Sequence, residues 1–376
     1  MAVLTEEQTM LRDAAKGWAS ESAPVGALRK LRDGKSGNSF DPAAWAEMGQ
    51  MVGVIVPEAY DGSAFGYLGL GLILEETGRT LAASPLLSTA MIAASALQLA
   101  GSDAQKQAWL PRIASGEIVA TLAIDEGSHH APARTNLSAA REKDGSYFLN
   151  GKKTFVLDGE AADLLIVVAR TDGEPGNTAG LTLFLVPTNS PGVSRTHLSL
   201  LDSRGATEIA FSAVELAADA VLGEVDKGWA VLEPTLDRAY AGLAAEMLGS
   251  ASAAFDITLD YLKTRTQFGQ VIGSFQALQH RAAKWFTDLE TTRSCVEAAL
   301  EAFDAGGDTR ALASLAKAKA SELVHLASNE MVQMHGGIGM TDAHDAGLYM
   351  KRARVTEALF GGASFHRDRY ARLMGF

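Results

Sequence analysis

Residues 265–269 read Arg-Thr-Gln-Phe-Gly, and residues 333–340 read Gln-Met-His-Gly-Gly-Ile-Gly-Met. In the first stretch a cation and an aromatic ring end one helical pattern, Gly269 breaks the chain, and a new helix is expected near Ser274. A guanidinium beside a fresh helix N-terminus suits a pyrophosphate. In the second stretch the glycines allow close backbone approach to a ligand and expose N–H groups. Either stretch alone is also typical of an ordinary loop between helices.

The chain around both stretches has a helical pattern. An apolar stripe at 4-3-4-4 spacing predicts one long helix running toward Thr264. The stripe consists of Leu236, Tyr240, Leu243, Met247 and Ala251. Further helices are expected from near Ser274, Thr309 and Ala346. Residues 227–376 are therefore predicted to form a C-terminal helical domain resembling a four-helix bundle.

Residues 118–226 change to short β-type runs separated by turn pairs. The runs are 118–124, 146–149, 153–157, 164–168, 181–186 and 208–214. Asp144-Gly145 and Asn150-Gly151 are hairpin signals, because type I′ turns need a positive φ at both central residues. This segment is predicted to be a middle antiparallel β domain.

Residues 1–117 are predicted to be an N-terminal α-helical domain, which makes the fold class α+β and multidomain. Thr5 and Ser102 each precede a glutamine by three residues, as in a capping box, and Pro42 is placed for a first helical turn. Residues 80–102 have no charged side chain, but their polar residues and proline favour a buried helix over a membrane span.

Composition restricts the class of protein. The 33 basic and 45 acidic residues give a net charge of −12, which disfavours a nucleic-acid-binding protein. The single cysteine, Cys295, excludes a disulfide framework and a thiolate-rich metal site, and it fits a reducing, cytoplasmic setting. Glu6 and Glu7 stand where a secretory signal would need positive charge. No metal site and no membrane partner are predicted.

Together with the α-β-α order, the two stretches closely resemble the acyl-CoA dehydrogenase family over essentially all 376 residues. The resemblance implies FAD-dependent α,β-dehydrogenation of an acyl-CoA thioester, with electrons passed to an electron-transfer flavoprotein. It also implies fatty acid or steroid side-chain catabolism, and a homo- or heterotetramer, because the family's arginine loop reaches into a neighbouring subunit. The positions that match FAD-binding residues of the family are Ile124, Phe155, Arg265, Phe268, Gln276, Gln333, Gly336 and Gly337.

The β-domain side of this implied site departs from the family pattern. Residues 124–127 read Ile-Asp-Glu-Gly where the family commonly has Thr-Glu-Pro. Phe155 can stack on a flavin ring, but Leu157 cannot donate a hydrogen bond to it.

The family reaction also needs a carboxylate that removes the proton α to the thioester. Most members carry it in a Glu-Gly pair near the C-terminus, after a run that reads Lys-Arg-Ala-Arg here at 351–354; this chain has Phe360-Gly361. Other members place it on the long helix, at the position of Ala239. Both positions are apolar in this chain.

Asp237 and Glu246 are the two carboxylates within the part of the long helix that carries the apolar stripe, and nine steps of about 100° put them on opposite faces. Asp237 matches a family aspartate associated with CoA, so Asp237, Tyr240 and Leu243 are the substrate-binding candidates. Glu246 lies within about 20° of the direction of Ala239 and about 10 Å further along the axis, which makes it the candidate base. The alternative is that Glu246 pairs with a basic residue and is structural.

Two other functions remain open. The empty base positions fit a non-catalytic or half-site partner subunit of a heteromeric acyl-CoA dehydrogenase, which some bacterial enzymes for steroid side chains resemble. They also fit a flavoprotein that eliminates a group from an acyl-CoA without α-proton abstraction. Residues 366–369 read His-Arg-Asp-Arg and are predicted to lie on a solvated or subunit-contacting helix face.

Overall fold

The computed structural model describes residues 4–34 and 39–376. The chain falls into two compact units. The first contains residues 1–30, 67–82 and 240–376, and the second contains residues 31–66 and 83–239. Helix α7 (Trp229–Thr264) contributes residues to both units.

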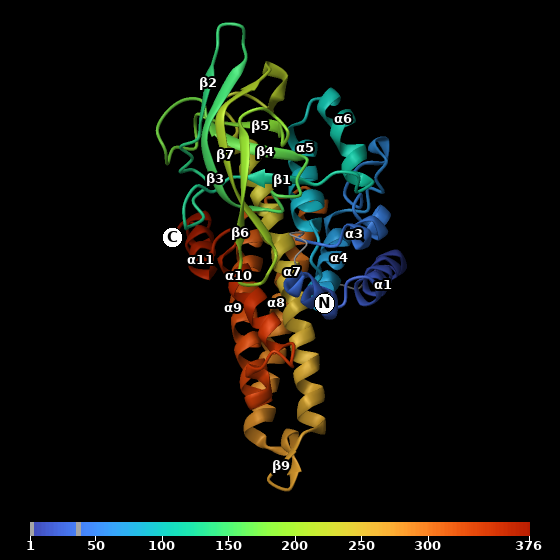
Figure 1. Ribbon diagram of the computed structural model, residues 1–376. Helices are drawn as coiled ribbons and strands as arrows, with labels where there is room; N and C mark the ends of the chain where they lie inside the picture. The colour runs from blue at the N-terminus through green and yellow to red at the C-terminus, as the bar shows by residue number, and fades with distance from the viewer. Residues whose placement is uncertain (1–3, 35–38) are drawn as a thin grey trace. The chain divides into compact units, whose positions relative to one another are not determined.

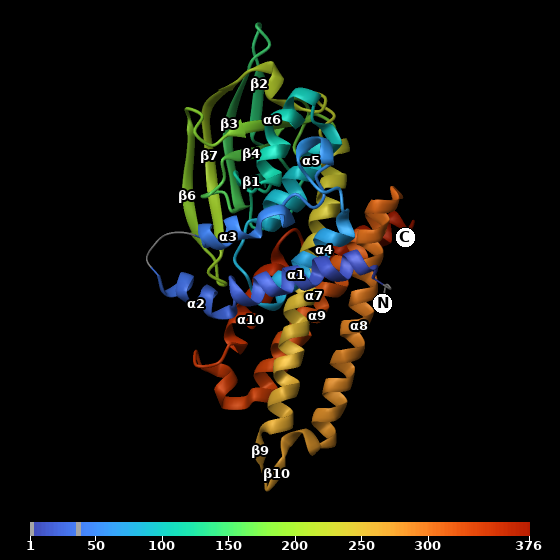
Figure 2. The ribbon, with the colours of Figure 1, turned by 90° about the vertical axis from the view of Figure 1, so that its right-hand side faces the viewer.

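The first unit is built almost entirely from helices. Besides most of α7 they are α1 (Glu6–Glu21), most of α2 (Val25–Asp33), α4 (Tyr67–Arg79), α8 (Gln276–Ala305), α9 (Arg310–His335), α10 (Ala346–Ala358) and α11 (Ala363–Leu373), with short helical turns η5 (Ile272–Ser274) and η6 (Gly336–Met340). Figure 1 and Figure 2 show α7, α8 and α9 running side by side to a hairpin of β9 (Thr266–Gln267) and β10 (Gln270–Val271). The expected long helix and the helix starts near Ser274, Thr309 and Ala346 are confirmed.

Helices α4 and α7 cross with their backbones in contact. A Cβ atom on Gly249 would lie 1.8 Å from the carbonyl oxygen of Glu75, and one on Gly78 would lie 2.1 Å from the carbonyl oxygen of Glu246. Only glycine leaves room for a carbonyl oxygen at such a distance. The crossing therefore depends on one glycine from each helix.

The second unit is organised around an eight-stranded sheet in the order β6-β7-β3-β2-β4-β5-β8, with β1 paired to β4. The strands are β1 (Ala120–Ala123), β2 (Ser138–Arg141), β3 (Tyr147–Leu157), β4 (Leu164–Arg170), β5 (Leu181–Pro187), β6 (Val193–Ser199), β7 (Gly205–Leu216) and β8 (Val221–Leu222). Helical elements α3 (Pro42–Met48), the π-helix η3 (Leu87–Ala93), α5 (Ala94–Ala100) and α6 (Asp103–Ala114) complete it, with short turns η1 (Gly49–Met51), η2 (Glu58–Tyr60) and η4 (Ala218–Ala220). Figure 2 shows α5 and α6 on one face of this sheet.

Two expectations for the β region were wrong in detail. The sheet is mixed, because β1 runs parallel to β4. Asn150-Gly151 is not a hairpin turn: β3 continues through it with a register shift against β7. Gly151 is needed there because a Cβ atom would come within 2.9 Å of the Leu137 Cα. The sequence pattern also missed strands β2 and β6.

The capping boxes at Thr5 and Ser102 and the N-cap before Pro42 are confirmed. The uncharged stretch of residues 80–102 contains η3 and α5, whose residues from Leu87 to Leu97 are buried. Among residues 4–34 and 39–376, no helix is both long and apolar enough to cross a bilayer.

We predict that Gly249→Ala destabilises the protein by about 1–3 kcal/mol or more, because the added methyl group forces α4 and α7 apart. Gly17→Ala is the matched control, since Gly17 lies inside α1 and a Cβ atom there would meet nothing within 4 Å. This control is expected to be neutral or stabilising by up to about 1 kcal/mol. Thermal unfolding followed by circular dichroism measures both, and equal melting temperatures for the two variants would contradict the backbone contact.

Candidate functional site

The two glycine-containing stretches of the sequence meet at one end of the helical unit. Leu262 of α7, Ile272 of η5 and Met334 of α9 form a small buried cluster there. The Tyr261 hydroxyl donates a hydrogen bond to the carbonyl oxygen of His335 across 3.4 Å. The residues that flank 265–269 therefore share one small core with the start of the 333–340 stretch, which is far away in the sequence.

Groups that can bind a ligand are uncovered at this end. Arg265, Gln276 and Gln333 are exposed, and Phe268, at the hairpin tip, is 90% exposed. Gly336 has a φ of 61° and a ψ of −136°, a conformation that favours glycine. A Cβ atom on Gly336 or Gly337 would meet no described atom within 4 Å, so the space beside their backbone is open. This set of donors fits a nucleotide with a pyrophosphate.

The β unit contains the other two predicted cofactor residues. Phe155 lies on β3 with a φ of 51°. It is 44% exposed, although it is a large aromatic residue within a sheet. Ile124, just after β1, is buried and its carbonyl oxygen accepts a hydrogen bond from Lys153 Nζ at 2.9 Å. Phe155 is therefore accessible for stacking, whereas the side chain of Ile124 is buried and its carbonyl oxygen is bound by Lys153.

Lys153 holds the segment after β1 through a buried ion pair. Its ammonium lies 2.7 Å from Glu126 Oε1. Glu126 also accepts the backbone N–H groups of Asn136 and Leu137 at 2.8 and 2.9 Å. Burial lowers the pKa of Lys153 to about 8 against the opposing effect of Glu126. Burial by itself raises the pKa of Glu126, but Lys153 and the two amides outweigh it and lower the pKa overall.

The predicted substrate residues of α7 are all buried: Asp237 is 1%, Tyr240 2% and Leu243 0% exposed. The Tyr240 ring packs edge-on against His366 with centroids 4.6 Å apart. The prediction that residue 366 lies on a solvated face is wrong, because His366 is fully buried. Its helix, α11, turns this side chain toward Tyr240 rather than outward.

Glu246 forms a buried ion pair with Arg352 of α10. Arg352 Nε and Nη2 donate to Glu246 Oε1 at 3.0 and 2.7 Å, and both residues are at most 5% exposed. This is the arrangement that the structural alternative predicts for Glu246. Arg352 belongs to the 351–354 run, which the sequence pattern did not connect to Glu246.

The corner between α10 and α11 carries Phe360 and Gly361, with positive φ values of 54° and 90°. Both carbonyl oxygens of this strained pair are held by fully buried side chains. His366 Nε2 lies 3.0 Å from Phe360 O, and Lys317 Nζ lies 3.0 Å from Gly361 O. Lys317 also donates to Thr356 O and Ser321 Oγ, at 3.0 and 3.1 Å. Phe360 itself is only 8% exposed.

Comparison with known proteins explains why these elements occur together. Family models for the N-terminal, middle and C-terminal domains of acyl-CoA dehydrogenases match residues 5–117, 121–216 and 226–375. The chain belongs to the acyl-CoA dehydrogenase family. It is accordingly an oxidoreductase that acts on acyl-CoA and uses FAD, and both predictions are confirmed.

Three relatives illustrate the likeness. Mitochondrial isovaleryl-CoA dehydrogenase of Pongo abelii is 31% identical over 372 residues, covering 97% of this chain and 88% of that protein. Butyryl-CoA dehydrogenase of Megasphaera elsdenii has a similar structure, with a TM-score of 0.94 at 26% identity over 100% of this chain and 99% of that chain. A chain of the ChsE4-ChsE5 complex of Mycobacterium tuberculosis gives a TM-score of 0.89 at 28% identity, and each chain is covered to 100%.

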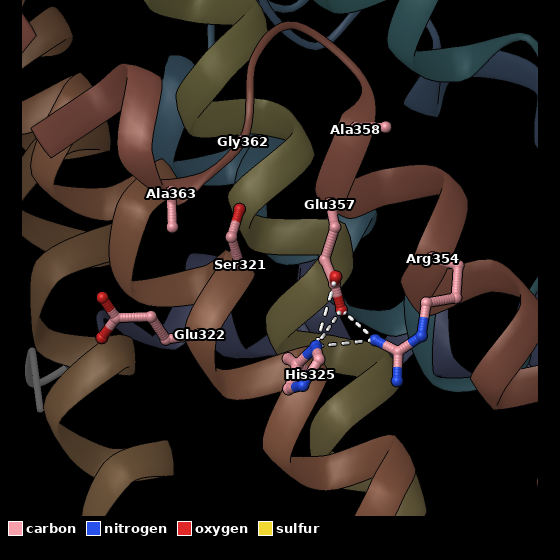
Figure 3. A pocket seen from close by; sticks show the side chains of 8 residues that line it. All are labelled: Ser321, Glu322, His325, Arg354, Glu357, Ala358, Gly362 and Ala363. Carbon is pink, nitrogen blue, oxygen red and sulfur yellow. Dashed lines mark hydrogen bonds and ion pairs between the residues drawn. The ribbon is translucent and has the colours of Figure 1, made fainter. Parts of the chain in front are cut away.

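A pocket of about 530 Å³ lies beside the Phe360–Gly361 corner of this acyl-CoA dehydrogenase. Figure 3 shows Glu357, His325 and Arg354 pointing toward one another at its wall. His325 Nδ1 lies 3.3 Å from Glu357 Oε1 and 2.9 Å from Arg354 Nη1. The remaining lining residues are Ser321, Glu322, Ala358, Gly362 and Ala363. Because its wall is strongly ionic, this pocket does not suit an acyl chain.

Sequence reasoning missed the role of four buried polar residues, Lys153, Lys317, Arg352 and His366, and of the partly buried Glu126. A lysine or arginine within an Ala- and Leu-rich helix, such as Lys317, was a signal of a buried partner that spacing alone could not name. In the described part of the chain, no group of three or more His, Cys, Asp or Glu residues could hold a metal ion.

We predict that Glu126→Gln destabilises this acyl-CoA dehydrogenase by about 3–5 kcal/mol at neutral pH, because it leaves Lys153 buried without a counter-charge. The folded pKa of Glu126 lies below its ordinary value of 4.5. Its stabilising contribution is therefore complete above about pH 4.5 and is lost as the pH falls through the lower folded value.

Melting temperatures measured from about pH 7 to pH 3 test this, and the variant should show a flatter acid limb than the wild type. A Glu126→Gln/Lys153→Met double variant is the control and should recover part of the loss. The ion pair has no such role if the single variant melts like the wild type at neutral pH.

Proposed function

We propose that the chain catalyses α,β-dehydrogenation of an acyl-CoA thioester and passes the electrons to an electron-transfer flavoprotein. The observation that carries this proposal is the small core that joins the residues flanking 265–269 to Met334 of the second stretch, with the backbone of Gly336 and Gly337 uncovered. The similarity to isovaleryl- and butyryl-CoA dehydrogenases supports the substrate class. A cytoplasmic location and assembly into a tetramer belong to the same proposal.

In this proposal different residues bind different parts of FAD. The nucleotide part is bound by Arg265, Phe268, Gln276, Gln333, Gly336 and Gly337. Phe155 stacks on the ring system of the flavin, and the backbone of Ile124 lines it. When bound, FAD supplies the hydride acceptor. Asp237, Tyr240 and Leu243 bind the CoA thioester and exclude water from it, so that the α-proton can be removed in a dry site.

Glu246 is the base in this proposal. Its ion pair with Arg352 affects both the orientation of the carboxylate and its strength as a base. Arg352 donates twice to Oε1 of Glu246, which fixes the orientation of the carboxylate. A guanidinium stabilises the charged form of a carboxylate and thereby makes it a weaker base. A base at Glu246 therefore requires the substrate to loosen this pair, whereas a structural Glu246 does not.

We predict that Glu246→Gln slows the bleaching of flavin absorbance by an acyl-CoA about 10²- to 10⁴-fold if Glu246 is the base. Glutamine has nearly the same shape and can still accept a hydrogen bond from Arg352. Single-turnover stopped-flow measurement separates this step from product release. Glu357→Gln, in the ionic pocket, is the matched control. An unchanged bleaching rate in a folded Glu246→Gln protein assigns Glu246 to the structural pair.

A second candidate function is favoured by the two empty base positions. Ala239 is 0% and Phe360 8% exposed, so each is filled by a buried apolar side chain. A chain that binds FAD or acyl-CoA without a free carboxylate would act as a half-site or non-catalytic subunit beside an unlike acyl-CoA dehydrogenase. The likeness to one chain of the ChsE4-ChsE5 complex supports this candidate.

Purification of the chain alone separates the two candidates. A yellow homo-oligomer that is bleached by acyl-CoA favours the complete enzyme, and a colourless protein that gains flavin only with a second chain favours the partner subunit.

We further predict that Phe360→Glu, which restores the family's Glu-Gly pair, speeds bleaching of the flavin by acyl-CoA about 10²-fold or more where only the base is missing. No gain in a folded, flavin-containing Phe360→Glu protein would contradict this account, and Phe360→Gln is its control.

A further inference from the structure

Three aromatic rings pack in tilted contacts where α9 ends and residues 336–340, here called the glycine loop, begin. Tyr261 of α7 and His335, the last residue of α9, have ring centroids 4.4 Å apart at 32°. His335 and His344, in the turn before α10, have centroids 4.3 Å apart at 43°. The stack therefore connects three separate elements. Its central ring belongs to His335, and the glycine loop begins at the next residue, Gly336.

The hydrogen bonds of His335 and His344 define the role of each Nδ1 atom. His335 Nδ1 lies 2.7 Å from the carbonyl oxygen of Met331, which can only accept, so this nitrogen carries the hydrogen. His335 Nε2 is buried and has no hydrogen-bond partner within residues 4–34 and 39–376. His344 Nδ1 accepts the Ala346 N–H at 3.1 Å, so this nitrogen carries no hydrogen.

A second proton on His335 conflicts with these contacts. It would occupy Nε2, which is buried without a described acceptor. His344 Nδ1 cannot accept it, because this nitrogen already faces the Ala346 N–H group. Burial lowers the pKa of His335, the Met331 carbonyl opposes this, and His344 lowers it further.

The charged groups nearest the stack do not relieve this conflict. Arg29 of α2 donates to Asp345 Oδ1 from Nε and Nη2 at 2.9 and 2.7 Å. Its Nη1 lies 3.3 Å from Asp342 Oδ2 and donates to Asp342 O at 2.7 Å. Both carboxylates beside His344 are thus engaged by a guanidinium, and Tyr261 packs on the other side of His335. Arg29 also holds the far end of the loop in place.

We propose that the Tyr261–His335–His344 stack positions the Gly336–Gly337 backbone for the flavin nucleotide, and that uptake of a proton by His335 opens the stack and weakens flavin binding. His335 and His344 are positioning residues, since they act through the loop. The inference rests on the proposed role of Gly336 and Gly337 in FAD binding. It adds to that role an acid-sensitive release of the cofactor.

The first test measures FAD affinity by flavin fluorescence between about pH 7.5 and pH 5. One proton taken up on release weakens binding about tenfold per pH unit below the pKa of the free form. His335→Phe keeps a ring in the stack but removes its titration, so the affinity of this variant for FAD should fall at least threefold less than that of the wild type over this range. His280→Phe, at an exposed histidine of α8, should behave like the wild type. Identical pH profiles for all three proteins overturn the proposal.

The second test does not need flavin. The Hε1 resonances of the eight histidines are followed by NMR during titration of the flavin-free protein. The His335 resonance, assigned from a His335→Phe variant, should titrate below the ordinary range, and His344→Phe should move its midpoint upward because it removes an imidazole that lowers the pKa of His335. An unperturbed His335 midpoint overturns the stack as a proton sensor. A protein that passes this test but binds no FAD contradicts the proposed function instead.

Discussion

Backbone contact between α4 and α7 is the constraint on which the first unit depends. The two glutamates whose carbonyl oxygens meet Gly249 and Gly78 also send their side chains to two further helices. Glu75 binds Arg293 of α8 at 2.7 Å, and Glu246 binds Arg352 of α10 at 2.7 Å. A crossing that only glycines allow thus brings two carboxylates to the centre of the bundle, where each pairs with a cation of a different helix.

Buried cations recur throughout the chain, and each is held by oxygen. Arg352 has a carboxylate, Lys153 a carboxylate and a carbonyl, and Lys317 two carbonyls and a hydroxyl. Burial lowers the pKa of Lys317 to about 7, partly offset by Glu357. A charge without such partners would cost several kcal/mol, so these contacts define single conformations of the segments that they join. Lys317 and His366 keep the corner of Phe360 and Gly361 in a conformation that is strained for phenylalanine.

These structural uses of charge bear directly on the chemistry. The buried carboxylate of Glu246 is engaged by an arginine, and the two positions where the family resemblance implies a base are occupied by alanine and phenylalanine. Exposed groups that suit a pyrophosphate, Arg265 and the Gly336–Gly337 backbone, lie elsewhere in the same unit. In the proposed function, the residues for the nucleotide are therefore accessible, whereas neither expected base position has a carboxylate.

The sequence by itself determined the order of helical and β segments, the long helix that ends at Thr264, and the two glycine-containing stretches. It also determined the helix caps at Thr5, at Ser102 and before Pro42. These are local properties, written in hydrophobic spacing, capping residues and turn chemistry. Only the tertiary structure decided that Asn150-Gly151 lies inside a strand, that His366 is buried, and that Glu246 meets Arg352. Such contacts join residues far apart in the chain, and sequence spacing carries no information about which distant side chain will face a buried charge.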